Sequence, residues 1–446
     1  MTNTSDVNRR VYTSQEDFLH QNEVLGTALP WCEDTSVLRQ VVSIGKKIAP
    51  NRLCAQAMEG CDGTRDGSPD ELTHRRYMRF AEGGVGVIWF EATACLEEGR
   101  ANPRQLWIRE DNLDAFKRLV EQIKQTALHT HGYEPIVIMQ DTHSGRYSKP
   151  HGTPAPRIAY RNPIFEGDHP LDEGCILSDD ELDRIGEALV NGAALAERAG
   201  FDGVDIKCCH RYLNSELLSA YEREGRYGGS LENRTRLLRE SVQGAIQQCS
   251  REFLVSSRLN VYDGFAYPYV FGVAEDGSLD FDASEPIWLL KQLSALGVKL
   301  LNITMGNPYF NPHVNRPFAL GGYTPAEHPL SGVARMLHGT AALKRAVPSI
   351  QLICSGLSYL GVAAPNVCAA FVNQGGFDLC GFGRTVFAYP SFAADVLQKG
   401  VMDPKQLCIC CSKCTEIMRS GSTPGCVVRD SLYGELYKQM KRGNKA

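Results

Sequence analysis

Short apolar runs rich in β-branched residues recur eight times along the chain, and stretches with the 3.6-residue period of an amphipathic helix lie between them. Each run has the length of one buried strand. The pattern therefore predicts eight strands that alternate with helices. The runs are residues 52–58, 86–94, 135–142, 203–209, 253–260, 300–306, 351–356 and 379–384.

One of the helical stretches carries clear start and stop signals. Ser178 is a candidate N-cap, because Glu181 follows three residues later and completes a capping box. Gly200 is a candidate C-terminal glycine for the same helix. The clearest helical stretches are residues 111–128, 178–200 and 234–249.

Eight strands that alternate with helices predict a closed (β/α)8 TIM barrel, in the α/β class. The competing architecture is an open doubly wound sheet, which usually carries a G-x-G-x-x-G motif after its first strand. No such motif follows any of the eight runs, and the glycines of residues 83–88 have a different spacing. In a barrel the chemistry lies at the carboxyl ends of the strands, so functional residues are expected there.

Composition and charge exclude several classes of partner. Hydrophobic residues make up 43% of the 446 residues, which suits a globular protein, and the formal net charge of −5 leaves no basic surface for nucleic acid. No run of about eighteen apolar residues predicts a membrane span. Residues 1–17 are polar and lack the apolar core of a signal peptide. We therefore expect a cytoplasmic protein with no membrane partner.

Near the C-terminus, cysteines crowd together at Cys408, Cys411, Cys414 and Cys426, with Cys410 among them. Three of them share one tight C-x2-C-x2-C loop, and the fourth returns after eleven residues. Four thiolates bind zinc at about 2.3 Å, and they bind a [4Fe–4S] cluster equally well. The cysteines alone do not distinguish the two. Other cysteines lie in apolar runs and are predicted to be small buried side chains, as at Cys54, Cys95, Cys354 and Cys380.

The ends of four predicted strands carry residues suited to a phosphorylated heterocycle. Gly356 and Gly383–Arg384 end the last two runs, where backbone N–H groups often bind phosphate and an arginine adds a bidentate partner. Their alternative role is that of ordinary turn residues. Gln140 and Arg258 end the third and fifth runs and are placed to donate hydrogen bonds to a flat ring over the barrel mouth. Alternatively, Arg258 is an ion-paired surface residue.

After the fourth run come Lys207, His210 and Tyr212. A neutral histidine donates to a carbonyl oxygen, and a tyrosine hydroxyl gives or takes a proton. Most His-x-Tyr pairs are structural, but a position at the end of a barrel strand favours a catalytic role. An ammonium at Lys207 favours an anionic or polarised substrate oxygen, or else a salt bridge to a neighbouring carboxylate.

These same segments resemble the old yellow enzyme family of flavin-dependent ene-reductases, over residues 51–392. The match covers the opening strand, the second strand with its loop, a Gln-x-x-His-x-Gly-Arg signature, and the fourth strand with the segment after it. In this sequence these are Asn51–Arg52 with Ala57–Met58, residues 83–100, Gln140–Arg146, and residues 200–213 followed by 227–236.

The resemblance implies FMN as cofactor and assigns roles around it. The flavin ring would be contacted by Gln140 and Arg258 and packed by Ala57, Met58 and Ala92. Its phosphate would be held by Gly356, Gly383 and Arg384. His210 would polarise the substrate carbonyl, and Tyr212 would be the proton donor.

The cysteine tail resembles the subgroup of 2,4-dienoyl-CoA reductases, enoate reductases and trimethylamine dehydrogenase-like enzymes, in which a [4Fe–4S] cluster passes electrons to FMN. That resemblance favours iron–sulfur over zinc. In the subgroup the middle cysteine gap is three residues and here it is two, so Cys410 is an alternative to Cys411 as ligand. Lys207 stands where the family has its first histidine. Glu59 stands where amine dehydrogenases carry a flavin-linked cysteine, which predicts a non-covalent flavin.

We expect an ene-reductase that uses FMN and a [4Fe–4S] cluster and reduces a small enone or enoate. We expect its electrons to come from a partner flavoprotein or ferredoxin, because the FAD and NAD(P) domains of the larger subgroup members do not follow the tail. NAD(P)H would be the direct or indirect electron donor. Whether the chain forms a homo-oligomer is left open. The predicted divisions are an extension or lid at 1–45, with a plug or lid at 27–38, a barrel at 46–398 and a cluster-binding segment at 399–446.

Two alternatives remain. One is oxidative demethylation of a methylated amine, for which Trp107, Tyr309 and Phe310 are candidates for an aromatic cage. The other is a non-catalytic barrel subunit stapled by zinc.

Overall fold

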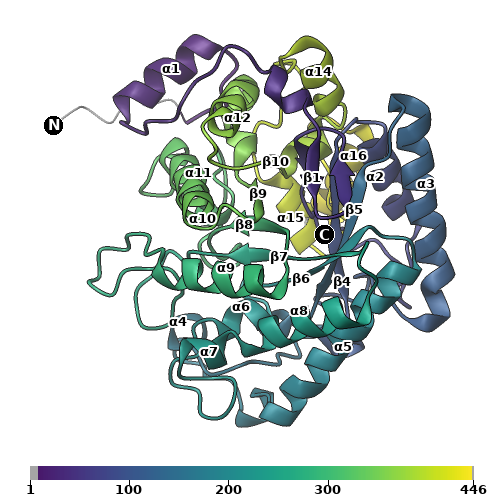
Figure 1. Ribbon diagram of the computed structural model, residues 1–446, viewed down its shortest axis with the longest axis vertical. Helices are drawn as coiled ribbons and strands as arrows, with labels where there is room; N and C mark the ends of the chain where they lie inside the picture. The colour runs from purple at the N-terminus through teal and green to yellow at the C-terminus, as the bar shows by residue number, and fades with distance from the viewer. Residues whose placement is uncertain (1–8, 444–446) are drawn as a thin grey trace.

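Eight parallel strands form a closed barrel with helices around it in the computed structural model, which describes residues 9–443 (Figure 1). The strands pair in chain order, and the last closes on the first, which confirms the predicted (β/α)8 barrel. They are β3 Leu53–Ala55, β4 Val87–Ala94, β5 Ile136–Thr142, β6 Gly203–Ile206, β7 Leu254–Asn260, β8 Leu300–Thr304, β9 Gln351–Cys354 and β10 Leu379–Phe382.

One helix of eight residues or more follows each strand and packs on the outside of the barrel. These are α2 Glu71–Ala81, α3 Leu113–His131, α5 Asp179–Arg198, α8 Arg236–Gln248, α9 Ser284–Leu296, α11 Pro329–Ala346, α12 Ala364–Asn373 and α14 Phe392–Lys399. Ser178 caps α5 in the predicted capping box with Glu181. Gly200 follows α5 with φ +86°. Across the described part of the chain, no helix combines the length and the apolar character needed to span a lipid bilayer.

Short elements lie in the N-terminal extension, in the loops at the carboxyl ends of the strands and in the C-terminal segment. The short helices are α4 Pro163–Glu166, α6 Leu213–Leu217, α7 Leu231–Arg234, α10 Pro312–Asn315 and α13 Arg384–Ala388. The 3-10 turns are η2 Ser36–Arg39, η3 Glu97–Gly99, η4 Glu110–Asn112, η5 Gly145–Tyr147, η6 Glu173–Cys175 and η7 Leu357–Ala363. α15 Lys413–Arg419 and α16 Ser431–Gly443 belong to the C-terminal segment.

A hairpin closes the amino-terminal end of the barrel. It consists of β1 Val42–Ile44 and β2 Lys47–Ala49, which pair antiparallel. Val42, Ile44 and Ala49 share one buried apolar cluster with side chains from the first residues of the barrel strands, among them Leu254 and Leu300. The opposite, carboxyl end is therefore the end open to ligands.

The N-terminal extension, which contains the predicted plug or lid at residues 27–38, contacts two of the outer helices, α11 and α12. The carbonyl of Thr27 accepts a hydrogen bond from His338 of α11 at 3.0 Å, and that of Cys32 accepts one from Asn366 of α12 at 2.9 Å. Figure 1 shows α1, Gln15–Val24, beside α12. Phe18 of α1 is fully buried, so burial of apolar side chains accounts for this position. Residues 1–8 of the predicted extension lie outside the described residues.

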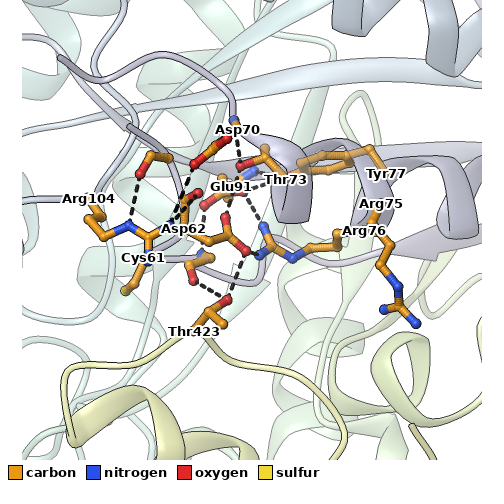
Figure 2. A network of polar contacts seen from close by, with 12 residues as sticks. Cys61, Asp62, Asp70, Thr73, Arg75, Arg76, Tyr77, Glu91, Arg104 and Thr423 are labelled. Atoms are coloured by element: carbon orange, nitrogen blue, oxygen red, sulfur yellow. Dashed lines mark hydrogen bonds and ion pairs between the residues drawn. The ribbon is translucent and has the colours of Figure 1, made fainter. Parts of the chain in front are cut away.

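A buried polar network ties the C-terminal segment to the barrel (Figure 2). The Arg76 guanidinium pairs with Glu91 at 2.5 Å and with Asp62. The hydroxyl of Thr423, from the C-terminal segment, donates to the same Asp62 carboxylate at 2.9 Å. Nearby, Asp430 accepts from Arg75 at 2.9 Å. Since losing one partner of a buried pair is costly, this network holds the segment against α2.

Candidate active site

A cavity of about 130 Å³ lies at the carboxyl ends of the barrel strands, and most of the predicted barrel site residues line it. Residues that follow β3 and β6 meet there with one residue each from β4 and β5. The β4 residue is presented at a register shift between Trp89 and Ala92, a local bulge that re-aims the side chain. The predicted residues in the lining are Ala57, Met58, Ala92, Gln140, Lys207, His210 and Tyr212.

Asp205, a buried carboxylate of β6 that sequence reasoning missed, fixes the floor of this cavity. It accepts hydrogen bonds at 2.6 Å from the Gln140 amide, from the Trp89 indole N–H and from the Arg258 backbone N–H. Burial raises the pKa of Asp205. The Arg258 side chain is buried, donates to the Ala57 carbonyl at 3.3 Å and keeps an unpartnered Nε. Gln140 and Arg258 are thus held in place, and the Arg258 Nε–H is still free to donate a hydrogen bond.

The loop after β6 is strained in a way that serves the site. His210 and Arg211 have φ of 64° and 58°, a region that costs non-glycine residues of order 1–3 kcal/mol. Burial, and then the charges of Arg258 and Lys207, hold the pKa of His210 well below its usual value. The imidazole is therefore neutral, and its Nε2 has no partner among the described residues. A neutral ring with one uncommitted nitrogen is suited to donate to a carbonyl oxygen.

Lys207 lies over the face of Tyr212, with Nζ 3.6 Å from the ring centroid. It is buried, and burial lowers the pKa of its ammonium. Among residues 9–443, Lys207 makes no salt bridge within 4.0 Å. The structure therefore does not contain the salt bridge that was the alternative role of this lysine.

The Tyr212 hydroxyl contacts two groups that the sequence did not place beside it. It lies 3.2 Å from Glu59 Oε2 and 2.9 Å from the Tyr309 hydroxyl. Tyr309 stacks on Tyr147, with ring centroids 3.9 Å apart. Tyr212 is 1% exposed, and burial raises its pKa well above the usual value. The phenol is therefore protonated at neutral pH.

The aromatic cage considered for a cationic substrate is not assembled. Tyr309 lines the cavity, but Phe310 packs against Phe165 and Phe265 at 5.2 and 5.3 Å. Trp107 lies under the Arg109 guanidinium, 4.4 Å from its ring centre. Only one of the three candidates thus faces the cavity.

The loops after β9 and β10 contain the predicted phosphate ligands. Gly356 has φ +87°, and a side chain at Gly383 would contact the Met58 sulfur at 3.4 Å. Arg384 is buried, donates through Nη2 to the Pro317 carbonyl at 2.6 Å and has an unpartnered Nη1. Burial and the charge of Arg384 lower the pKa of nearby Arg316 to about 10. Two close guanidinium groups with an N–H to spare fit an anion such as the FMN phosphate.

The four predicted cysteine ligands line one small cavity of about 20 Å³ beside Arg384. Backbone N–H groups of Cys410 and Arg429 donate to the sulfurs of Cys408 and Cys426 at 3.4 and 3.3 Å. Cys410 is buried and does not line this cavity. In residues 9–443, no three His, Cys, Asp or Glu side chains are arranged to hold a metal ion. The donor set of four thiols with N–H···S bonds is nevertheless suited to an iron–sulfur cluster. The lining residues are Cys408, Cys411, Cys414 and Cys426.

The C-terminal segment contributes to both cavities. Cys414 and Phe387 line the cysteine cavity and also the cavity at the barrel mouth. Met418 and Arg419 of α15 line the mouth as well. The predicted cluster segment and the barrel thus form one continuous site.

A larger cavity of about 560 Å³ adjoins the mouth and leads outward. The two share Glu59, Tyr309, Met418 and Arg419 in their linings. The two cavities therefore meet beside the Tyr212 hydroxyl, which contacts Glu59 and Tyr309.

Comparisons with known proteins agree with the barrel fold. The model of the NADH:flavin oxidoreductase / NADH oxidase family matches residues 40–271, just over half of the chain. An NADPH dehydrogenase of Halalkalibacterium halodurans is 30% identical over 270 residues, which are 59% of this chain and 70% of the relative.

Two solved structures share the fold. A complex of 2-naphthoyl-CoA reductase with 2-naphthoyl-CoA aligns with a TM-score of 0.70 at 20% identity, covering 91% of this chain and 58% of that one. Histamine dehydrogenase from Rhizobium sp. 4-9 aligns with a TM-score of 0.65 at 19% identity, covering 88% and 52%. The chain thus spans between half and three-fifths of the length of these two proteins.

Proposed function

The chain belongs to the NADH:flavin oxidoreductase / NADH oxidase family, the old yellow enzyme family, and on that premise we propose that it is an ene-reductase dependent on FMN and a [4Fe–4S] cluster. Membership makes the protein a flavin-dependent oxidoreductase. The substrate would be the C=C bond of an α,β-unsaturated carbonyl compound. One observation carries the proposal: a protonated tyrosine and a neutral histidine face the same cavity as Gln140.

The barrel residues would hold FMN non-covalently. Gln140 and Arg258 would donate to the ring over Ala57, Met58 and Ala92, and the phosphate would lie against Gly356, Gly383 and Arg384. Bound there, FMN supplies the hydride that the substrate β-carbon receives.

The protein's own groups would complete the reduction. The uncommitted nitrogen of His210 would donate to the carbonyl oxygen and stabilise the enolate that develops on it. Tyr212 would then protonate the α-carbon as general acid. Lys207, without a carboxylate partner, would favour a substrate that carries an anionic or strongly polarised oxygen near this position.

The four cysteines that share one cavity would hold the cluster, with Cys411 rather than Cys410 as second ligand because it lines that cavity. Since Cys414 lines both cavities, electrons would have a short path to the flavin site. A partner flavoprotein or ferredoxin would deliver them, with NAD(P)H as direct or indirect donor. In this proposal residues 46–398 form the barrel and 399–446 the cluster segment, whose last three residues lie outside the described range.

Oxidative demethylation of an amine is the second candidate, and the charge of the cavity disfavours it. A methylated ammonium would meet Lys207, whose Nζ already occupies the face of Tyr212. Like charges in a buried site repel strongly. A zinc-stapled barrel without catalysis is the third reading, and metal content distinguishes it.

Anoxic purification followed by cofactor analysis and a substrate panel tests the proposal. We expect FMN and about four irons per chain, and turnover of cyclic enones or enoates with a chemical electron donor. Zinc without iron would contradict the cluster. Oxidation of methylated amines without enone reduction would contradict the reaction.

A further inference from the structure

The carboxyl group of Glu59 is positioned between the proposed proton donor and the outer cavity. Glu59 lines both the 130 Å³ cavity at the barrel mouth and the 560 Å³ cavity outside it. Its Oε2 lies 3.2 Å from the Tyr212 hydroxyl. Its Oε1 is buried and has no partner among the described residues. One side chain therefore connects Tyr212 to the space through which water and substrate reach the site.

The surroundings of Glu59 favour its neutral, protonated form. Leaving a buried carboxylate oxygen without a hydrogen bond is costly, and protonation relieves that cost. Burial raises the pKa of Glu59, and Lys207 and Lys149 oppose this effect with their positive charges. Tyr212, Tyr309, Cys61 and Glu91 also face this region. The remaining charged or titratable groups in the linings of the two cavities are Arg65, Arg104, Arg146, Tyr147, His210, Arg316, Cys414 and Arg419. A protonated carboxyl group is able to donate a proton to the Tyr212 oxygen.

The other neighbours of Tyr212 are less suited to give it a proton. Lys207 lies over the face of the ring, 3.6 Å from its centroid, rather than at the hydroxyl. Tyr309 contacts the hydroxyl at 2.9 Å, but one phenol has little driving force to protonate another. A carboxylic acid is a far stronger acid than a phenol, so proton transfer from Glu59 to a tyrosinate is strongly downhill.

We propose that Glu59 is the positioning residue that returns a proton to Tyr212 after each turnover, taking it from water in the outer cavity. The proposal rests on the proposed function. The α-carbon of the substrate gains the Tyr212 proton, which leaves a tyrosinate. The Glu59 carboxyl group gives its proton to that oxygen and becomes a carboxylate. A water-borne proton from the outer cavity restores the acid, so the cycle takes up one proton from solvent and leaves both residues unchanged.

The test uses Glu59→Gln in the loaded enzyme, because glutamine keeps the size and a hydrogen bond to Tyr212 but has no proton to release. Glu134→Gln is the matched control, since Glu134 is exposed and lies two residues before β5, at the closed end of the barrel. We expect enone-driven flavin reoxidation under multiple turnover to fall roughly 100-fold in Glu59→Gln, the lower end of the range for a lost proton-transfer group. Added acetic acid should restore several-fold of that loss, which it would not do for a structural defect.

A second readout needs no flavin. The infrared spectrum of flavin-free protein, in mildly acidic buffer above the ordinary glutamate pKa, should show a protonated carboxyl band that Glu59→Gln lacks and Glu134→Gln keeps. Loss of activity without rescue by acetic acid, or carboxyl bands that are the same in the unmodified protein and in Glu59→Gln, would overturn the relay while leaving enone reduction intact. Absence of enone turnover in the unmodified protein would instead overturn the proposed function.

Discussion

Replacing Tyr212 with phenylalanine removes the hydroxyl that the proposed mechanism uses and little else. The ring, its packing and its contact with the Lys207 ammonium at 3.6 Å all remain. The hydroxyl loses its contacts with Glu59 Oε2 and with the Tyr309 hydroxyl. The variant therefore isolates the proton source.

The effects of this substitution on folding stability and on reaction rate are measured separately. Leaving buried polar groups short of one partner costs about 1–3 kcal/mol of folding stability. Loss of a positioned general acid lowers the rate by about 10²–10⁴-fold, or roughly 2.7–5.4 kcal/mol of barrier. The protein should therefore stay folded while reoxidation of its flavin by an enone slows by two to four orders of magnitude.

Stopped-flow mixing under anoxic conditions measures the two half-reactions apart. Reduction of the flavin by a chemical donor should be nearly unchanged in Tyr212→Phe, since it needs no proton from this residue. Reoxidation by the enone should carry the whole loss. If reoxidation is near the rate of the unmodified protein, the proton comes from elsewhere and the role of Tyr212 is wrong.

Three further outcomes are expected. Cys426→Ser should lose iron and keep FMN, because Cys426 lines the cysteine cavity but not the cavity at the barrel mouth, whereas Cys414→Ser should lose iron and also weaken FMN binding, because Cys414 lines both of these cavities. Iron and flavin analysis of both variants checks this, and equal flavin content would contradict it. Lys207→Met should raise KM for enoates about fivefold, from about 1 kcal/mol of lost ion pairing, and leave KM for neutral enones unchanged; equal effects on both would favour a structural role. Burial lowers the pKa of His143 from 6.5 to about 3, so below pH 6.5 the unfolded chain binds a proton that the folded chain does not, and folding stability falls on acidification. Between pH 7 and pH 5 this loss of stability is about 2 kcal/mol. Urea unfolding of His143→Gln should show a correspondingly smaller loss between these pH values, and a loss equal to that of the unmodified protein would contradict the assignment.

The barrel was predictable from the sequence because the spacing of apolar residues along the chain reflects which side chains are buried. Strands buried on both faces read as short apolar runs, and capping signals such as Ser178 with Glu181 act locally. Positions at strand ends such as Gln140 and Tyr212 followed from the barrel itself, since its carboxyl ends converge. Local patterns and fold geometry together were enough for these residues.

Other site residues depend on contacts between distant segments, which no local pattern encodes. Glu59 and Tyr309 are far apart in sequence from Tyr212, and only the closed barrel brings them to its hydroxyl. Asp205 lies inside an apolar run that forms a strand. A single acidic residue in such a run was the only local sign that this position has a role in the site. The contacts of the N-terminal extension with α11 and α12 were also beyond the sequence, because its apolar residues do not reveal which surface they cover.

The central claim is that reduced flavin in this protein gives hydride to an unsaturated carbonyl compound. The most direct test is to mix anoxic, chemically reduced protein with a cyclic enone and follow the flavin absorbance and the products in a single turnover. The account predicts reoxidation with one saturated ketone formed per flavin. Flavin that stays reduced with enones and enoates, while a methylated amine bleaches the oxidised form, would contradict it.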